Sequence, residues 1–277
     1  MHVSLDSALG RQRRLNSVGE SVLQIAPNAA AAYSLRSLTG GDPRVVRVRR
    51  DTGGGAGDND EQDFTASGIS SGALVAFVGS GNDGFVETWY DQSGNSEDAV
   101  QETAGSQPKI VNAGDLVVLS GVPALSFDGS FFAATGFAFS PSGDFLAVTV
   151  SKISTGNLID TRDGGSDGFF IQQGSSDVRY RYNGDGSIDV SGNNQHIIST
   201  VELNGTTLTA YKDGSSAGTD TVTAGLSTTE ALSIGKVAFS SANTVSGSVQ
   251  EVILYATDKS ANRVALETNI NSHYSIF

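Results

Sequence analysis

Residues 202–214 read Glu-Leu-Asn-Gly-Thr-Thr-Leu-Thr-Ala-Tyr-Lys-Asp-Gly. Two turn dipeptides, Asn204-Gly205 and Asp213-Gly214, enclose the alternating run Thr207–Tyr211. Asn-Gly and Asp-Gly between alternating runs are strong hairpin signals, because these residues tolerate the positive φ angles of a tight two-residue turn. The stretch therefore predicts two successive hairpins, which form an antiparallel meander.

Similar signals recur on both sides of this meander. Short β-branched and aromatic runs alternate with clusters of Gly, Asn, Asp and Ser, and Gly occurs 34 times in 277 residues. This pattern is typical of an all-β sandwich or barrel. Besides the meander, we expect strands at 45–49, 74–78, 85–90, 99–101, 110–111, 116–119, 124–127, 145–150, 157–160, 169–173, 178–182, 196–202 and 249–255. The continuous apolar run 145–150 is the best candidate for a central strand.

Helical signals are confined to the two ends of the chain. Ala29 to Leu38 predicts a short helix, and residues 261–273 predict a final helix that Asp258 or Ser260 caps. In the first segment Leu15, Val18, Val22 and Ile25 recur at helical spacing, but glycines and Pro27 interrupt it. We expect an N-terminal arm at 1–28 and one jelly-roll domain at 29–277.

The charges are divided unevenly along the chain. The formal net charge is −13, yet residues 1–50 carry eight of the 17 Lys and Arg and a net charge of about +5, which leaves about −18 for the rest. Such an asymmetry indicates an arm that meets an acidic partner. The alternative is that these arginines pair with the chain's own acidic body. An acidic body is a poor match for nucleic acid, whose phosphates need a basic surface.

Composition also excludes several kinds of site. There is no cysteine, so disulfides and thiolate metal sites are impossible, and the three histidines are far apart in sequence. No stretch is apolar for 18 residues, so we expect no membrane span. Arginines fall where a secretory signal would have its apolar run, so we expect no such signal.

Aromatic residues beside polar turns are the candidates for ligand contact. Trp89, the only tryptophan, is followed at once by the polar turn Asp91 to Asn95. Tyr180 and Tyr182 share one face of their expected strand. These rings, with Asp91 and Asn95 as polar groups at the rim, could form a carbohydrate-binding surface. The alternative is that the rings pack in the core, as buried aromatics usually do.

One acidic cluster could hold a cation. Residues 58–63 read Asp-Asn-Asp-Glu-Gln-Asp, and calcium prefers several carboxylate and carbonyl oxygens. The cluster lacks the spacing of an EF-hand loop. It could instead be a solvated turn, or supply partners for Arg47 to Arg50. Apart from calcium here, the sequence indicates no metal and no cofactor.

Two resemblances emerge from these motifs. The run 202–214 resembles a recurrent hairpin of concanavalin A-like and laminin-G-like jelly rolls, which implies that fold. A tighter resemblance covers residues 30–277. Segments 33–36, 46–50, 58–64, 89–95 and 107–110 follow in the order seen in the catalytic domain of arabinofuranosidase B-type glycosidases and in phage virion proteins that carry that domain. The opening residues 4–14 are similar to the leader of such phage structural proteins.

The residues that the glycosidase resemblance would make catalytic are changed in this chain. The family implies a Glu in the strand that follows the central one and an Asp just after the glycine of a late strand, since retaining enzymes need two carboxylates. Here Asp160 stands in the first region, and Lys236 follows Gly235 in the second. The resemblance therefore implies a domain that kept the scaffold and lost the chemistry. An active enzyme would have to use Asp160 with Asp163, Asp167 or Glu251.

The sequence thus favours a non-catalytic virion protein of a bacteriophage, in the tail, the baseplate or a capsid decoration. We expect its arm to dock on other virion proteins, the copies to form a homo-oligomer in the particle, and the body to contact host glycans. A purely structural sandwich is the alternative within this class, and an arabinofuranosidase-like hydrolase is the alternative outside it. The predicted docking residues are Arg11, Arg13, Arg14, Leu15, Val18 and Val22.

Overall fold

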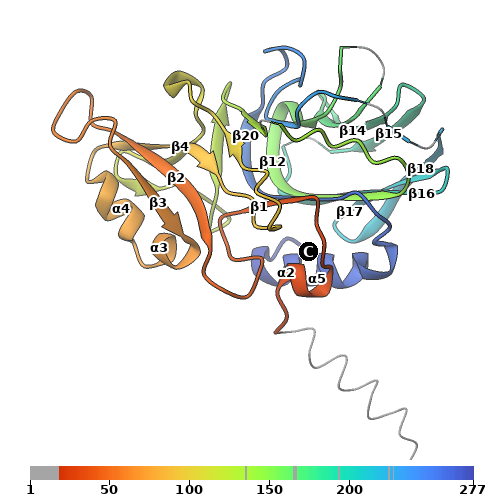
Figure 1. Cartoon of the computed structure of the whole chain (residues 1–277), viewed down its shortest axis with the longest axis horizontal. Coiled ribbons are helices and arrows are strands. Elements are labelled where there is room, and N and C mark those ends of the chain that lie inside the picture. The colour runs from red at the N-terminus through yellow and green to blue at the C-terminus, as the bar shows by residue number, and fades with distance from the viewer. Residues whose placement is uncertain (1–18, 135, 165–166, 193, 224, 227) are drawn as a thin grey trace, which may run out of the picture.

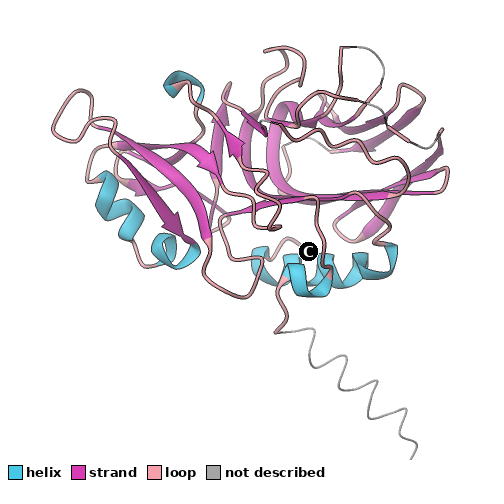
Figure 2. Ribbon diagram, viewed as in Figure 1, coloured by secondary structure: helices cyan, strands magenta, loops and turns pink. Residues whose placement is uncertain are grey.

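The computed structural model describes residues 19–134, 136–164, 167–192, 194–223, 225–226 and 228–277. The body is a β-sandwich of jelly-roll type with a C-terminal helix (Figures 1 and 2). In the first half of the chain the elements are α2 (Val22–Ile25), β1 (Ala31–Ser34), β2 (Arg44–Asp51), β3 (Glu61–Thr65), α3 (Ala66–Ser70), α4 (Ala73–Val78), β4 (Asp83–Trp89), β5 (Ala99–Val100), η1 (Ala104–Ser106), β6 (Lys109–Asn112), β7 (Asp115–Leu116), β8 (Val118–Leu119), β9 (Val122–Pro123), β10 (Leu125–Asp128) and β11 (Phe132–Ala134).

The second half contains the long central strand and the predicted meander. Its elements are β12 (Phe145–Asp160), β13 (Phe169–Gln173), β14 (Asp177–Tyr182), β15 (Gly186–Ser191), β16 (Ile197–Asn204), β17 (Thr207–Lys212), β18 (Ser215–Thr221), β19 (Ser233–Ile234), β20 (Ser246–Tyr255) and α5 (Ser260–Tyr274). The hairpins β16–β17 and β17–β18 form as predicted, with two-residue turns at Gly205-Thr206, directly after Asn204, and at Asp213-Gly214. None of the described helices combines the length and the apolar character needed to cross a bilayer.

Strand β12 organises the sheet because it has partners along its whole length. Its first part pairs with β16 on one side and β20 on the other. Its last residues pair with β13 and β19 instead. The run 145–150 is therefore central, as predicted, whereas 157–160 is the far end of the same strand and not a separate one.

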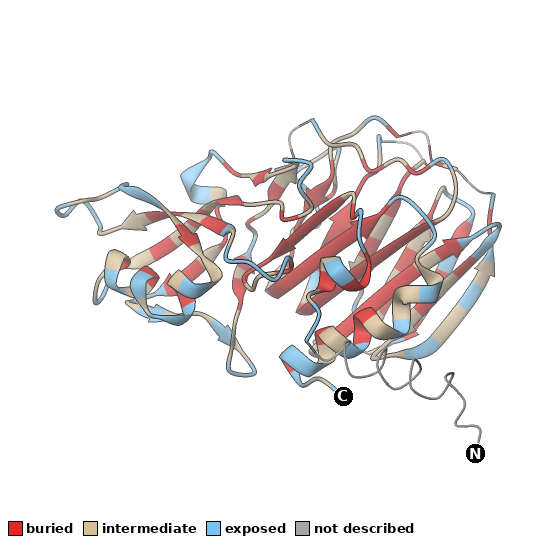
Figure 3. Cartoon of the chain, turned by 60° about the horizontal axis from the view of Figure 1, so that its bottom comes forward, coloured by how far each residue is buried: buried red, intermediate tan, exposed pale blue. Residues whose placement is uncertain are grey.

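Two hydrophobic clusters stabilise this arrangement. The larger lies inside the sandwich and includes Trp89, Phe132, Phe145 and Tyr182. The smaller lies between the opposite face of β12, β16 and β20 and the helices α2 and α5, with Val22, Ile198 and Ile270 among its members. Figure 3 shows the buried strands behind the half-buried helices on this side. The face of α5 predicted from Leu266, Ile270 and Tyr274 is the buried one.

Two secondary-structure predictions were wrong. The alanine-rich run 31–34 is strand β1 and not helix, because it pairs with β20 in the register Ala31↔Leu254 to Ser34↔Glu251. Residues 73–78 form helix α4 and not a strand. Such a short apolar run has no period that separates helix from strand, and its tertiary contacts decide the outcome.

Candidate functional site

The two regions in which the glycosidase resemblance places its acids meet at the end of β12. Ile159 and Asp160 pair with Ile234 and Ser233 of β19. Just beyond β19, the Gly235 N–H donates to the carbonyl of Leu158 at 2.9 Å. A Cβ at Gly235, where φ is +100°, would come within 2.8 Å of the Phe127 ring, so glycine is needed for this close approach. Lys236 follows directly, so Asp160 and Lys236 lie on adjacent segments.

The carboxylate of Asp160 is hydrogen-bonded to neighbouring residues of the same chain. It is fully buried. It accepts hydrogen bonds from Arg162 Nη2 at 2.5 Å, from Arg162 Nε at 3.1 Å and from the Arg162 backbone N–H at 2.9 Å. Asn157 Nδ2 donates a further bond at 2.6 Å. A buried charge that is paired and hydrogen-bonded in this way is stabilised as a structural anion. Asp160 therefore presents no free oxygen to a substrate.

Lys236 occupies the position of the second expected acid. Its ammonium donates to the Ser240 carbonyl at 3.2 Å and lies 4.7 Å from the centre of the Phe131 ring. Burial lowers the pKa of Lys236, against the opposite pull of the Asp160 and Glu230 charges. A cation beside Asp160 cannot serve as the second carboxylate of a retaining pair.

Aromatic and cationic side chains form the surface around this pair. The guanidinium carbon of Arg162 lies 3.8 Å from the centre of the Phe170 ring and 5.6 Å from that of Phe239. Phe239 is 45% exposed. A cavity of about 300 Å³ adjoins this group, with Arg162, Phe170 and Arg181 among its lining residues. We call Arg162, Phe170 and Phe239 the aromatic rim. The sequence did not predict this rim, and its one local signal is Phe239 directly before Ser240 and Ser241.

Glu251, one of the other acids considered for catalysis, does not complete a pair with Asp160. Glu251 pairs with Val150 in the sheet, ten positions along β12 from Asp160. It is fully buried, and Arg36, Ser34 and Tyr274 all bond to its carboxylate. Asp163 and Asp167 follow Asp160 in the next loop, and each interacts with other groups of the protein.

Three of the five residues predicted to bind carbohydrate are core residues. Trp89, Tyr180 and Tyr182 are fully buried. The Trp89 ring lies 5.7 Å from that of Tyr33, and the Tyr182 ring stacks on Phe145 at 5.7 Å. Burial leaves none of these ring faces open to a sugar, so this part of the prediction was wrong, although Tyr182 also lines the cavity beside Arg162 and Phe170. Core packing, the alternative, is the correct interpretation.

The two polar residues of that prediction fasten the turn after β4 to β1. Asp91 accepts hydrogen bonds from the backbone N–H groups of Ala32 and Ser93, at 2.8 and 2.9 Å. Asn95 Nδ2 donates to the carbonyls of Ala29 and Ala30, at 2.9 and 3.0 Å. These contacts give both side chains a structural role.

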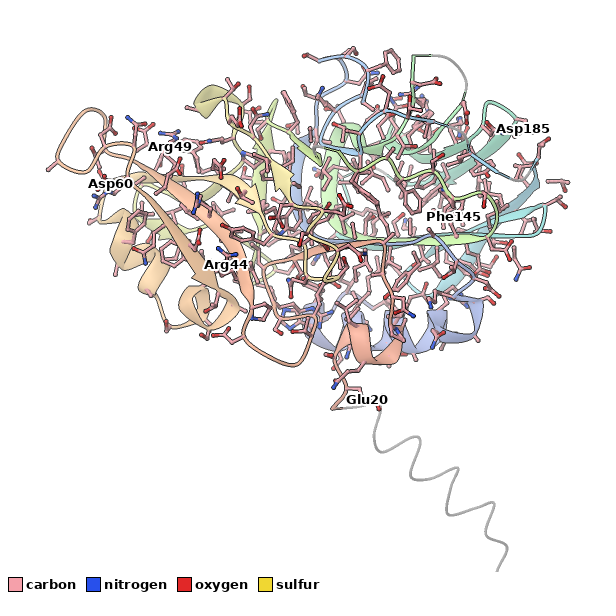
Figure 4. The ribbon with its side chains drawn as sticks, viewed as in Figure 1. Glu20, Arg44, Arg49, Asp60, Phe145 and Asp185 are labelled. Atoms are coloured by element: carbon pink, nitrogen blue, oxygen red, sulfur yellow. The ribbon has the colours of Figure 1, made fainter. Side chains whose placement is uncertain are left out.

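The acidic cluster 58–63 lies against the arginines of β2. Asp60 pairs with Arg50 at 2.6 Å, and Asp63 pairs with Arg44 and Arg47 at 2.8 and 2.9 Å. Figure 4 shows Arg44, Arg49 and Asp60 at the same end of the molecule. Within the described ranges, no three His, Asp or Glu side chains are grouped so as to hold a metal ion. The predicted alternative, that these acids are partners for the arginines, is confirmed.

The docking residues fall into two groups. Arg11, Arg13, Arg14, Leu15 and Val18 lie outside the described residues. Val22 is fully buried in the cluster beneath α5. Its side chain is therefore not free to contact another protein, and its assignment as a docking residue was wrong. Residues 21–26 belong to the packed body, because Val22, Ile25 and Ala26 are all buried in that cluster.

Comparisons with known proteins identify relatives in structure only. Neither a protein-family model nor a curated protein sequence matches the chain. A GH54 α-L-arabinofuranosidase soaked with a cyclic sulfate inhibitor superposes with a TM-score of 0.63 at 13% identity, over 90% of this chain and 64% of that one. An arabinofuranosidase in complex with arabinofuranosyl-α-1,2-xylobiose gives 0.58 at 15%, over 87% and 62%.

A third similar structure is the binding domain of a larger protein. The binding domain of Paraclostridial Mosquitocidal Protein 1 superposes with a TM-score of 0.50 at 14% identity, over 68% of this chain and 50% of that one. The chain thus spans less than two thirds of each of these three structures. At these identities the likeness establishes a glycosidase-like β-sandwich fold, and function has to be argued from the site.

Proposed function

We propose that this chain is a non-catalytic glycan-binding protein of a bacteriophage virion, built on a glycosidase-like jelly roll. The observation that carries the non-catalytic part is the pairing at the end of β12. Asp160 is buried under Arg162 and Asn157, and Lys236 takes the second position. A retaining glycosidase needs two carboxylates about 5–5.5 Å apart, one of them free to attack the sugar.

Glycan contact is assigned to the aromatic rim. Phe239 offers an exposed ring, and the Arg162 guanidinium lies between it and the Phe170 ring. An apolar ring face beside hydrogen-bond donors matches the mixed surface of a sugar, which has apolar C–H faces and polar edges. The adjoining cavity of about 300 Å³ gives room for one sugar unit.

Binding is tested by applying the wild-type chain to a glycan array and then comparing variants on the glycans that bind. Phe239→Ala removes the exposed ring, and we expect about a 3- to 10-fold loss of affinity, since aromatic contacts contribute about 0.5–1.5 kcal/mol. Phe277→Ala is the matched control, because Phe277 is 57% exposed and lies at the C-terminus. A blank array would leave only the purely structural role.

Hydrolysis is tested with aryl-arabinofuranosides. We expect no release of sugar by the wild-type chain. Release that Asp160→Asn abolishes, in a protein that still folds, would overturn the non-catalytic assignment and support the arabinofuranosidase alternative.

The virion assignment is supported by the leader resemblance at residues 4–14, which carry Arg11, Arg13 and Arg14. The other five arginines of residues 1–50 pair with the chain's own acids, so their charge does not support docking. We assign docking on other virion proteins to Arg11, Arg13 and Arg14. Deletion of residues 1–18 is the sharpest test, because it spares Val22 and the cluster beneath α5. We expect the truncated protein to fold and to be absent from purified particles. Normal incorporation into particles would refute the docking role.

A further inference from the structure

A second cleft lies on the outer face of the sheet, built from other elements than the aromatic rim. Its volume is about 550 Å³. Phe85 of β4, Lys109 and Asn112 of β6, and Ser126 and Asp128 of β10 line it. Ser130, in the turn that follows β10, completes the wall.

The strand alternation explains why these side chains face outward. Leu125 and Phe127 of β10 are buried in the sandwich, so Ser126 and Asp128 point to the opposite face. In β4 and β6 the buried neighbours Val86 and Ile110 place Phe85 and Lys109 on that same outer face. The register confirms that they are adjacent, because Lys109 pairs with Phe85 on one side and with Ser126 on the other.

Two polar groups of this cleft have no partner among the described residues. Ser130 is only 6% exposed, yet its hydroxyl makes no hydrogen bond. Asp128 is exposed, and its carboxylate takes part in no hydrogen bond or ion pair that the described structure contains. Buried polar groups in folded proteins are nearly always hydrogen-bonded, so an orphaned hydroxyl in a cleft indicates a partner that binds from outside.

The charges of the cleft favour a neutral ligand over an anionic one. The Lys109 ammonium is held by Asp83 at 2.7 Å and by Asn112 at 3.1 Å. The neighbouring Arg49 is only 7% exposed and bonds to Gln107 at 2.9 Å. The carboxylate of Asp128 is therefore the charge left unpaired, and it attracts hydrogen-bond donors and repels anions.

The Phe85 ring is the apolar part of the cleft, but two cationic side chains already lie against it. Arg49 lies 5.0 Å and Lys109 5.3 Å from the ring centre. A ligand in this cleft must therefore be recognised mainly through its polar groups. Hydroxyl groups of a sugar fit, because each can both donate to Asp128 and accept from a serine hydroxyl.

We propose that this cleft is a second glycan site that binds a neutral saccharide unit, with Asp128 accepting hydrogen bonds from adjacent sugar hydroxyls and Ser130 adding a further bond. This inference rests on the proposed glycan binding, but it uses none of the aromatic rim. Ser130 lines the cleft, and the ring of its neighbour Phe131 lies 4.7 Å from the Lys236 ammonium.

The test compares neutral and acidic sugars by isothermal titration of the full chain. The probes are oligosaccharides of galactose, glucose and arabinose, with oligogalacturonate as the acidic counterpart. Asp128→Asn removes the charge and keeps the shape, and we expect at least about a 10-fold loss of affinity for the neutral probe that the wild type binds, because hydrogen bonds to charged groups are the stronger ones. The matched control is Glu20→Gln, an exposed carboxylate at the start of the described chain (Figure 4).

A second variant separates binding from folding. Ser130→Ala removes a hydroxyl that has no partner inside the protein, so we expect an unchanged or higher melting temperature together with weaker binding of the neutral probe. Equal affinity of the wild type and Asp128→Asn, or a preference for oligogalacturonate, would overturn the proposal. If Phe239→Ala lowered the affinity and the two cleft variants did not, the aromatic rim would be the glycan site and the cleft would not. If the wild type bound none of the probes, the proposed glycan binding would be refuted at the aromatic rim and at the cleft.

Discussion

The guanidinium of Arg36 donates to both carboxylate oxygens of Glu251, from Nε to Oε2 at 2.8 Å and from Nη2 to Oε1 at 3.1 Å. Glu251 is fully buried, and the Tyr274 hydroxyl donates a further bond to it at 3.0 Å. Arg36 follows β1, Glu251 lies in β20 and Tyr274 ends α5. One carboxylate thus ties together the beginning and the end of the folded body.

Replacement of Arg36 by methionine should therefore be strongly destabilising. The change leaves the buried Glu251 carboxylate without its charged partner, and breaking a buried ion pair in this way costs about 3–5 kcal/mol. Arg44→Met is the control, because Arg44 is 61% exposed in its pair with Asp63. Exposed pairs contribute about 0–1 kcal/mol. Urea denaturation measures the free energy of unfolding of both variants. Equal decreases in the two variants would show that the Arg36 pair contributes no more than the exposed Arg44 pair.

Asp63 should make stability depend on pH in the acid range. Burial alone would raise its pKa, but hydrogen bonds from Arg47, Arg44 and Tyr90 lower the pKa of Asp63 to about 2. In the unfolded chain an aspartate titrates near pH 4, at about 3.9. The folded form is favoured wherever Asp63 is ionised, so this contribution is fully present above about pH 4 and is lost as the pH falls toward 2.

The measurement is the free energy of unfolding of the wild type and Asp63→Asn from pH 5 to pH 2. We expect the difference between the two proteins to shrink as the pH falls through this window. A difference that stays constant from pH 5 to pH 2 would contradict the lowered pKa of Asp63.

Gly156 should not tolerate a side chain. Its φ is +99°, and an added Cβ would lie 2.3 Å from the Thr244 carbonyl oxygen, so Gly156→Ala forces the backbone of β12 to shift. Gly205 is the matched control, because its φ is +61° and a Cβ there meets nothing within 4 Å. The left-handed backbone alone costs about 1–2 kcal/mol for a residue with a Cβ. We expect a clearly larger loss for Gly156→Ala than for Gly205→Ala in thermal unfolding, and similar losses would argue against the close contact.

Trp89 should matter for stability through its volume and not through its N–H. The indole nitrogen is buried without a hydrogen-bond partner in the described structure, so phenylalanine at this position loses no bond. Trp89→Ala should cost about 3–5 kcal/mol, as large-to-small changes in a core do, and Trp89→Phe much less. Chemical denaturation measures both. Loss of glycan binding by a fully folded Trp89→Phe protein would reopen the sugar-site interpretation of this residue.

The sequence predicted those parts of the fold that are decided locally. Two-residue turns at Gly205-Thr206 and Asp213-Gly214 join neighbouring strands, and the run from Phe145 to Val150 is buried along its whole length. Residues 31–34 could not be assigned in this way. Their alanines favour helix, and only the distant partner β20 makes them a strand.

The candidate sites were harder to predict, for a related reason. Residues 160 and 236 were paired through a family resemblance, but nothing local indicated that Arg162 would neutralise Asp160. Phe85, Lys109 and Asp128 lie on three separate strands, and only the register of the sheet brings them to one cleft. Trp89 shows the opposite error, since an aromatic residue before a polar turn suggested a surface where the chain has a core.

The pairing of β1 with β20 also decides when the molecule can fold. Ala31 meets Leu254 in the sheet, and Val22 packs in the cluster beneath α5. As the ribosome releases the chain, the strand edge at β1 must wait for more than two hundred further residues before its partner emerges. Contacts of such long range form late and slowly. The growing chain therefore leaves the β1 edge without its sheet partner until β20 has been made.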